Sequence, residues 1–249
     1  MVVMVVFRSC LTLKIFIGSM IKRIRDYGKK EPNRDAHKIY IVCEGKGTEP
    51  AYFSFFENCS SNLEIITIPP TEGTDAIKLM EKAKEQLLGE DRTFTVEYEH
   101  GDTVWFIFDT DLNEAEGKIE PLRIFCEDMN SHITDNLDEV KPYKAWNVAQ
   151  SDPSFEIWLY YHFYSDTPEE EEVEEYSSFK EYVNGKITGG FNFHRDPIRL
   201  EDAIANATLH LTKTEEGKLM GYATEMPVLG KEILKFTKSE LDKLRNKLR

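Results

Sequence analysis

Short apolar runs alternate with segments of helical periodicity along the first two thirds of the chain. Four runs are predicted strands: IYIVC (39–43), LEIITIP (63–69), TVWFIF (103–108) and YKAWNVAQ (143–150). Continuous apolar runs such as IYIVC and TVWFIF are typical of strands that are buried on both faces. A helical pattern follows each run: AYFSFFENC, AIKLMEKAKEQLL, EPLRIFCEDMNSH and SFEIWLYYHFY. The order β-α-β-α-β-α-β-α predicts an α/β fold with a parallel four-stranded sheet.

Residues with capping character mark the starts of these helices. We expect Thr48 to cap the first helix, with Pro50 in its first turn. Thr74 or Asp75 is expected to cap the second helix, and Pro153 to begin the fourth.

The character of the chain changes beyond residue 165. An acidic stretch (166–176), whose run 169–175 we interpret as a solvated loop, precedes FKEYVN and two further helical patterns, at about 198–213 and 228–248. We therefore predict three parts. Residues 1–37 form a partly disordered N-terminal extension, residues 38–165 the α/β core, and residues 166–249 a helical addition packed on the core.

The net charge bears on the binding partners of the chain, and the spacing of its cysteines bears on its cellular compartment. The chain has 45 acidic and 31 basic residues among 249, for a net charge of −14. That acidity weighs against a nucleic-acid partner, but much of it comes from 166–176, whereas 22–38 and the tail (231–249) lean basic. The four cysteines form no CxxC pair, which favours a reducing, cytoplasmic setting.

The first 20 residues are apolar but are interrupted by Arg8 and Lys14, so they are too short to span a membrane. They also lack the charge order of a signal peptide. We interpret Met20 as the functional start; an amphipathic segment on a membrane surface is the alternative.

Acidic residues follow three of the predicted strands. Glu44 and Glu49 come after the first strand, Asp109 and Asp111 after the third, and Glu156 after the fourth. Because the carboxyl ends of parallel strands meet at one edge of a sheet, these side chains are expected to converge there. Carboxylate oxygens are the ligands that Mg²⁺ and Mn²⁺ prefer, so the pattern predicts a site for one of these ions.

Each of these acids also has an ordinary structural interpretation. A DxD after a strand is common in polar loops, Glu49 suits a helix N-terminus, and Ser151 or Asp152 can simply cap a helix. Glu156 is harder to explain, because it stands among apolar residues where an unpaired carboxylate is costly. A metal, a Lys or Arg, or a helix-end amide would compensate.

Other chemistries find less support. EGKGTE (44–49) lacks the GxxxxGK[ST] pattern of a P-loop, which argues against a nucleoside triphosphatase. The six histidines are scattered, with His162 only loosely near Glu156, and no nucleophile elbow is present. Lys46 lies between two glycines, where it can contact a phosphate.

Three motifs in order resemble a known family. They are EGxxTE after the first strand, FDxD after the third, and S-x-P-x-FE-x-WL-x-x-HF after the fourth. The chain resembles the RloB family, which is associated with restriction-modification loci and phage defence and is related to Toprim-fold nucleases. The resemblance is good over about 38–165 and looser in the tail.

The resemblance implies a Toprim-like core and a role for each acid. Glu44 would be a metal ligand or general acid/base, Asp109 and Asp111 would hold the metal, and Glu49 and Glu156 would be further ligands. The correspondence departs in two places: the first acids are spaced Glu-x4-Glu, and Ser151 precedes Glu156 by more than a Ser-x-Glu pattern allows. A site with one metal ion and a site with two are therefore both consistent with the sequence.

We expect a Mg²⁺- or Mn²⁺-dependent nuclease that acts on RNA or DNA in anti-phage defence, with Lys46 or a basic residue of the tail offsetting transition-state charge. The alternative is a catalytically silent or partner-activated Toprim-like binding module, and a phosphotransferase or primase-like enzyme ranks last. An ATPase from the same locus is an expected partner and a membrane is not; self-association into a homo-oligomer stays open.

Overall fold

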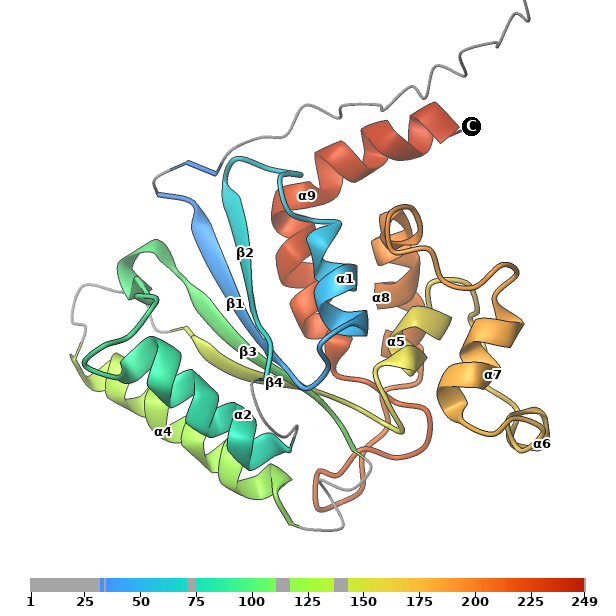
Figure 1. Ribbon diagram of the computed structural model, residues 1–249, viewed down its shortest axis with the longest axis horizontal. Coiled ribbons are helices and arrows are strands. Elements are labelled where there is room, and N and C mark those ends of the chain that lie inside the picture. The colour runs from blue at the N-terminus through green and yellow to red at the C-terminus, as the bar shows by residue number, and fades with distance from the viewer. Residues whose placement is uncertain (1–31, 34, 71–74, 111–116, 137–142, 249) are drawn as a thin grey trace, which may run out of the picture.

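Four parallel strands form one sheet, in the order β2-β1-β3-β4 (Figure 1). The structure is a computed structural model, and it describes residues 32–33, 35–70, 75–110, 117–136 and 143–248. The strands are β1 (His37–Cys43), β2 (Leu63–Ile68), β3 (Thr103–Asp109) and β4 (Trp146–Ser151). The predicted α/β class with a parallel four-stranded sheet is confirmed.

Both faces of the sheet are covered, which explains why its central strands are apolar at successive positions. In β1, Ile39 and Ile41 point into one hydrophobic cluster, and Tyr40 and Val42 point into the other. All residues of β3 but the last are buried. Side chains alternate across a strand, so a strand covered on both sides needs apolar residues at every position.

Helices form a layer on each face. One layer contains α2 (Ala76–Ala83) and α4 (Ile119–Asn136), which lie side by side in Figure 1. The opposite layer contains α1 (Thr48–Ser54), α5 (Glu156–Tyr160), α8 (Leu200–Leu209) and α9 (Met226–Leu248). Two short helices, α6 (Glu170–Val173) and α7 (Phe179–Lys186), lie beyond α5.

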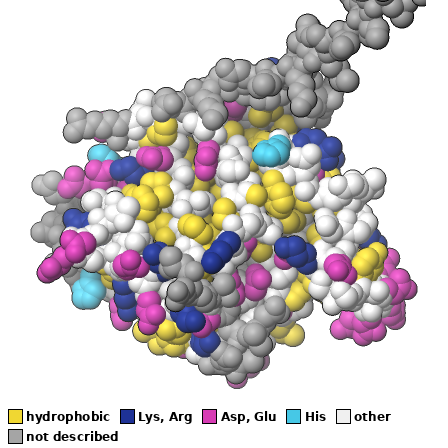
Figure 2. Space-filling view, in the orientation of Figure 1, with side chains coloured by type: hydrophobic (Ala, Val, Ile, Leu, Met, Phe, Trp, Pro, Cys, Tyr) yellow, Lys and Arg dark blue, Asp and Glu magenta, His cyan; other side chains and the backbone are white. Residues whose placement is uncertain are grey.

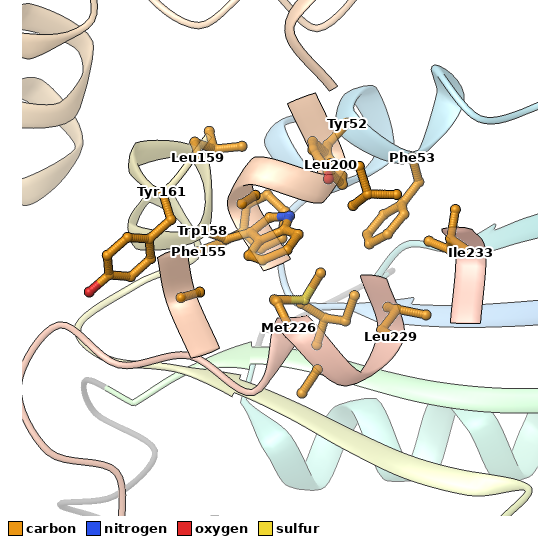
Figure 3. Packing of buried hydrophobic residues seen from close by; sticks show 14 of the residues in the cluster. Tyr52, Phe53, Phe155, Trp158, Leu159, Tyr161, Leu200, Met226, Leu229 and Ile233 are labelled. Carbon is orange, nitrogen blue, oxygen red and sulfur yellow. The ribbon is translucent and has the colours of Figure 1, made fainter. Parts of the chain in front are cut away.

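Aromatic side chains dominate the second layer. Figure 3 shows Trp158 of α5 between Tyr52 and Phe53 of α1 and Met226 and Leu229 of α9, and all five are essentially inaccessible to solvent. Burial of each such side chain stabilises the fold by about 1.5–3 kcal/mol. Residues beyond 165 therefore contribute directly to the core that the strands use, although the division at residue 165 stays a prediction.

A half-buried polar contact attaches α9 to the amino ends of the central strands. The carboxylate of Glu232 accepts hydrogen bonds from Thr103 Oγ1 at 2.7 Å and from Trp105 Nε1 at 3.0 Å. It also lies 2.8 Å from Nε2 of His37, whose ring stacks on Phe236. This contact sets the rotation and height of α9 against the sheet.

Three local expectations are wrong. Thr48 does not cap α1: the N-cap is Gly47, and Thr48 is the first residue of the helix. The expectation for α2 is correct, since Asp75 caps it by accepting a hydrogen bond from the Lys78 amide at 3.0 Å. The helix after β4 begins at Glu156 rather than Pro153, and the Phe155 amide that precedes it donates to Asp109. It ends at Tyr160, where hydrogen bonds of three-residue spacing replace the helical ones.

The acidic run 169–175 is not wholly a loop, because it contains the short helix α6. Its side chains remain exposed, and Figure 2 shows acidic groups gathered over this part of the surface. Glutamate is a good helix former, which accounts for the extra turn.

No helix in the described part of the chain is both long and apolar enough to cross a membrane. The expectations for residues 1–20 concern positions outside the described residues.

Close packing between α8 and α9 yields a first prediction. A Cβ on Gly230 of α9 would stand 3.0 Å from Cγ1 of Ile204 and 3.3 Å from Cη2 of Trp158. The substitution Gly230→Leu is therefore expected to lower the free energy of unfolding by about 1–3 kcal/mol through overpacking. Urea denaturation measures it. Lys231→Leu, at the exposed neighbouring position, should change stability by no more than about 0.5 kcal/mol; equal effects would contradict the packing.

Candidate active site

The sheet has a topological switch point between β1 and β3. The connection from β1 to β2 passes through α1 on one face, and the connection from β2 to β3 passes through α2 on the other. In open parallel sheets such a divergence leaves a crevice at the carboxyl ends of the two strands, where ligands bind. Glu44 follows β1 at this point, and Asp109 is the last residue of β3.

Glu44 and Asp109 are in direct contact, as the sequence predicts for acids at neighbouring strand ends. The Glu44 amide donates to the Ile107 carbonyl oxygen at 3.0 Å, which continues the β1–β3 ladder. The Glu44 carboxylate turns back over the strands and accepts the Asp109 amide at 3.0 Å. The backbone of β3 thus fixes the orientation of Glu44.

Glu49 reaches the same region from the first turn of α1. It is buried, and Oε1 accepts the Gly45 amide at 2.8 Å. A Cβ at position 45 would stand only 2.1 Å from Oε2 of Glu49. Gly45 is therefore required by the close approach of this carboxylate to the backbone.

The loop after β4 brings in the fourth carboxylate. The Phe155 amide donates to Oδ1 of Asp109 at 2.8 Å, and Glu156 follows as the first residue of α5. Ser154 donates its hydroxyl to Oε2 of Glu156 at 2.8 Å. Ser151 does not cap this helix: its hydroxyl is 2.8 Å from that of Thr224. The Ser-x-Glu spacing is therefore present, but it begins at Ser154.

The carboxylates repel one another at a place where two of them, Glu49 and Glu156, are buried. Burial raises the pKa of Asp109 well above its usual range, and the nearby carboxylates of Glu44, Glu49 and Glu156 raise it further. Burial also raises the pKa of Glu49, to which the Glu156 carboxylate adds. A cation that binds here would relieve this repulsion.

Lys180 of α7 supplies positive charge that sequence reasoning missed. Its Nζ lies 3.4 Å from Oε1 of Glu156 and donates to Oγ1 of Thr48 at 3.2 Å. Its charge also opposes the rise in the pKa of Glu49. Lys180 is 24 positions from Glu156 in an otherwise ordinary helix, so no local motif marks it. Lys46, the predicted phosphate contact, is exposed in the turn between β1 and α1.

Comparison with known proteins identifies the family. The model of the RloB-like protein family matches residues 39–233, which include most of β1, the other three strands and the first part of α9. The chain belongs to the RloB-like protein family. Searches of curated proteins and of solved structures found no match.

The donor set of this RloB-like protein suits a hard divalent cation, since all four side chains offer carboxylate oxygens. Within the described residues, however, no three Asp, Glu, His or Cys side chains stand at the spacing of a ready metal site. Each of the four carboxylates instead accepts a hydrogen bond from a nearby donor. Asp111 lies outside the described residues. Binding of an ion would require these carboxylates to turn toward one point.

A polar network supports the chain just beyond Asp109. Gln150 donates to the Thr110 hydroxyl at 2.8 Å, and Arg123 of α4 donates to the Gln150 side-chain oxygen at 2.8 Å. Arg123 also pairs with the buried carboxylate of Glu225 at 2.9 Å, and Lys213 does so at 2.6 Å. The segment that leads into α9 thereby holds the start of the DxD loop in place.

His162 does not belong to the site. It is fully buried, with Nδ1 2.9 Å from the Trp158 carbonyl oxygen and Nε2 3.2 Å from the Tyr52 hydroxyl. Burial lowers the pKa of His162 to about 3, so the ring is neutral and ties α1 to α5.

The close approach at Gly45 yields a second prediction. Gly45→Ala is expected to lower the free energy of unfolding by about 2–3 kcal/mol, because the new Cβ displaces the buried carboxylate of Glu49. Gly47→Ala is the matched control in the same turn, since a Cβ there meets nothing within 4 Å. That variant should cost less than about 1 kcal/mol, the range of an N-cap substitution. Urea titrations in which the two variants lose equal stability would contradict the geometry.

Proposed function

We propose that the protein is a divalent-metal-dependent nuclease that hydrolyses phosphodiester bonds of RNA or DNA in an anti-phage defence system. One observation carries the proposal: Asp109 lies at the β1–β3 switch point next to Glu44, Glu49 and Glu156, so that four acids gather at one edge of the sheet. Membership of the RloB-like family supports it, because the motifs resemble those of Toprim-related nucleases. The reducing cytoplasm is the expected compartment.

The residues divide into metal-holding and charge-offsetting groups. Glu44 and Asp109 would hold Mg²⁺ or Mn²⁺ from adjacent strand ends, with Asp111, Glu49 and Glu156 as the further ligands. When bound, such an ion stabilises negative charge on the scissile phosphate and activates a water molecule. Lys180 places an ammonium group beside Glu156, where it would offset the charge of the phosphate. Lys46, in the turn after β1, would be a further phosphate contact.

A second candidate function is a module that becomes active only with a partner, for example an ATPase from the same locus. It is favoured by the hydrogen bonds that hold each carboxylate apart from the others, because a partner can supply the rearrangement that brings them together. Mixing the purified ATPase with the protein would show this as metal binding or cleavage that the protein alone lacks.

The nuclease proposal predicts a specific loss in Asp109→Asn. The wild type should bind Mn²⁺ in calorimetry and cleave RNA or DNA. Asp109→Asn should weaken Mn²⁺ binding by about tenfold or more and slow cleavage by about 100-fold or more, because a neutral amide is a poorer ligand than a carboxylate. A wild type that binds no divalent ion, alone or with its partner, would contradict the proposal.

Asp102→Asn is the matched control at the opposite end of the same strand. Asp102 is fully buried and accepts two backbone amides, from Lys38 and Glu97, each at 2.9 Å. One of these acceptors is lost in the amide, so this variant should melt lower yet keep its Mn²⁺ affinity. Asp109→Asn keeps an oxygen for the Phe155 amide and removes like-charge repulsion. In EDTA it should therefore melt no lower than the wild type, which separates loss of metal binding from unfolding.

A further inference from the structure

Five aromatic rings pack one against the next, from a ring just beyond the end of α5 to a ring in the segment that meets the carboxyl end of β4. We call this the ring ladder, and its members in order are Tyr164, Tyr160, Tyr182, Phe179 and Tyr222. Successive ring centroids are 4.6, 6.2, 5.8 and 5.5 Å apart, with interplanar angles of 26°, 27°, 30° and 25°. These distances lie in the range of favourable aromatic pairs. Tyr160 and Tyr182 are buried, so the ladder is anchored in the core.

Tyr222 is the end ring of the ladder. It is half-buried, and among the described residues no ring other than Phe179 packs against it. Its backbone is left-handed, with φ of 49°, which is unfavourable for a bulky residue. The Tyr161 hydroxyl donates to the Tyr222 carbonyl oxygen at 2.6 Å, and the Asp152 amide donates to that of Ala223 at 2.8 Å. Strain that the surroundings maintain in this way is typical of functional positions.

The last two rings of the ladder belong to segments that border the candidate active site. Phe179 immediately precedes Lys180, whose Nζ is 3.4 Å from Glu156. Tyr222 precedes the segment in which Thr224 forms an antiparallel bridge with Ser151, the last residue of β4. Figure 1 shows the same arrangement, with α7 beside α5 and the chain that enters α9 passing the end of β4.

The surroundings of Tyr222 and of Lys180 differ in charge. Tyr222 lies near the carboxylates of Glu170, Asp152 and Glu174, which together with its burial raise the pKa of its hydroxyl. A phosphate is disfavoured there, whereas the neutral face of a base is not. Lys180, on the side of the candidate active site, offers the cation that a phosphate needs. These charges suit a base at Tyr222 and a phosphate at Lys180.

We propose that Tyr222 is a stacking platform for an unpaired nucleobase, so that the candidate active site takes single-stranded nucleic acid. The proposal rests on the proposed function for the identity of the bound polymer. A base in a duplex has both faces covered by its neighbours, so only an unpaired or flipped base can extend the ring ladder. Stacking accepts every base, which implies recognition of strandedness rather than of sequence.

The test measures binding rather than cleavage. Labelled oligothymidylate and oligouridylate of about 12 nucleotides, a length typical of single-strand sites, are titrated in Ca²⁺ and followed by fluorescence anisotropy. The comparators for the tighter of the two are a strand of equal length without bases and the corresponding duplex. We expect the wild type to bind the single strand about tenfold more tightly than either comparator, as one base–aromatic stack predicts.

Variants assign the preference to one ring. Tyr222→Leu should lose most of the tenfold preference without weakening the binding of the abasic strand, and Tyr222→Phe should keep it. Phe193→Leu is the control, because Phe193 is a half-buried aromatic that contacts Phe191 outside the ring ladder. Circular dichroism checks that each variant is folded. If Tyr222→Leu does not fold, the wild-type comparison of normal and abasic strands decides.

Equal binding of normal and abasic strands, or of single strand and duplex, would overturn the inference even if the protein cleaves nucleic acid. A stacking preference in a protein that cleaves nothing would uphold the inference and count against the nuclease instead. Absence of binding to either single strand would contradict it outright.

Discussion

Repulsion among four carboxylates in one crevice is the constraint on which the candidate site depends. Glu49 and Glu156 are buried, and Asp109 is close enough to both that its charged form is disfavoured. The surrounding structure offsets this with at least one donor for each acid. Backbone amides serve three of them: that of Asp109 for Glu44, that of Gly45 for Glu49, and that of Phe155 for Asp109. The Ser154 hydroxyl and Lys180 serve Glu156, and a dication would stabilise the four acids further once they turn toward it.

The fold explains why the acids meet where they do. The chain leaves β1 and enters β3 on opposite faces, so the carboxyl ends of these two strands border an open crevice. The C-terminal part of the chain completes the surroundings. Lys180 comes from α7, and Glu225, at the start of α9, holds Arg123 and so Gln150 against the strand end. Residues on both sides of position 165 therefore build one site.

The strands and the neighbouring pair of Glu44 and Asp109 could be predicted from sequence, because burial on both faces leaves an uninterrupted apolar run with a polar residue at its end. Lys180 could not be predicted, since its contact with Glu156 depends on how α7 packs and no short-range pattern records that. The short length of α5 was also missed, because the aromatic residues keep helical spacing beyond Tyr160, where the helix ends. The position of Asp111 stays a prediction.

The central claim is that Glu44 and Asp109 hold a divalent ion at the β1–β3 switch point. The most direct measurement is a crystal structure of the wild type soaked in Mn²⁺, with anomalous scattering used to locate the metal. The account predicts an anomalous peak within about 2.0–2.6 Å of carboxylate oxygens from both residues, with at least one further acid turned toward it. A well-occupied Mn²⁺ elsewhere in the crystal and none at this edge of the sheet would contradict the account.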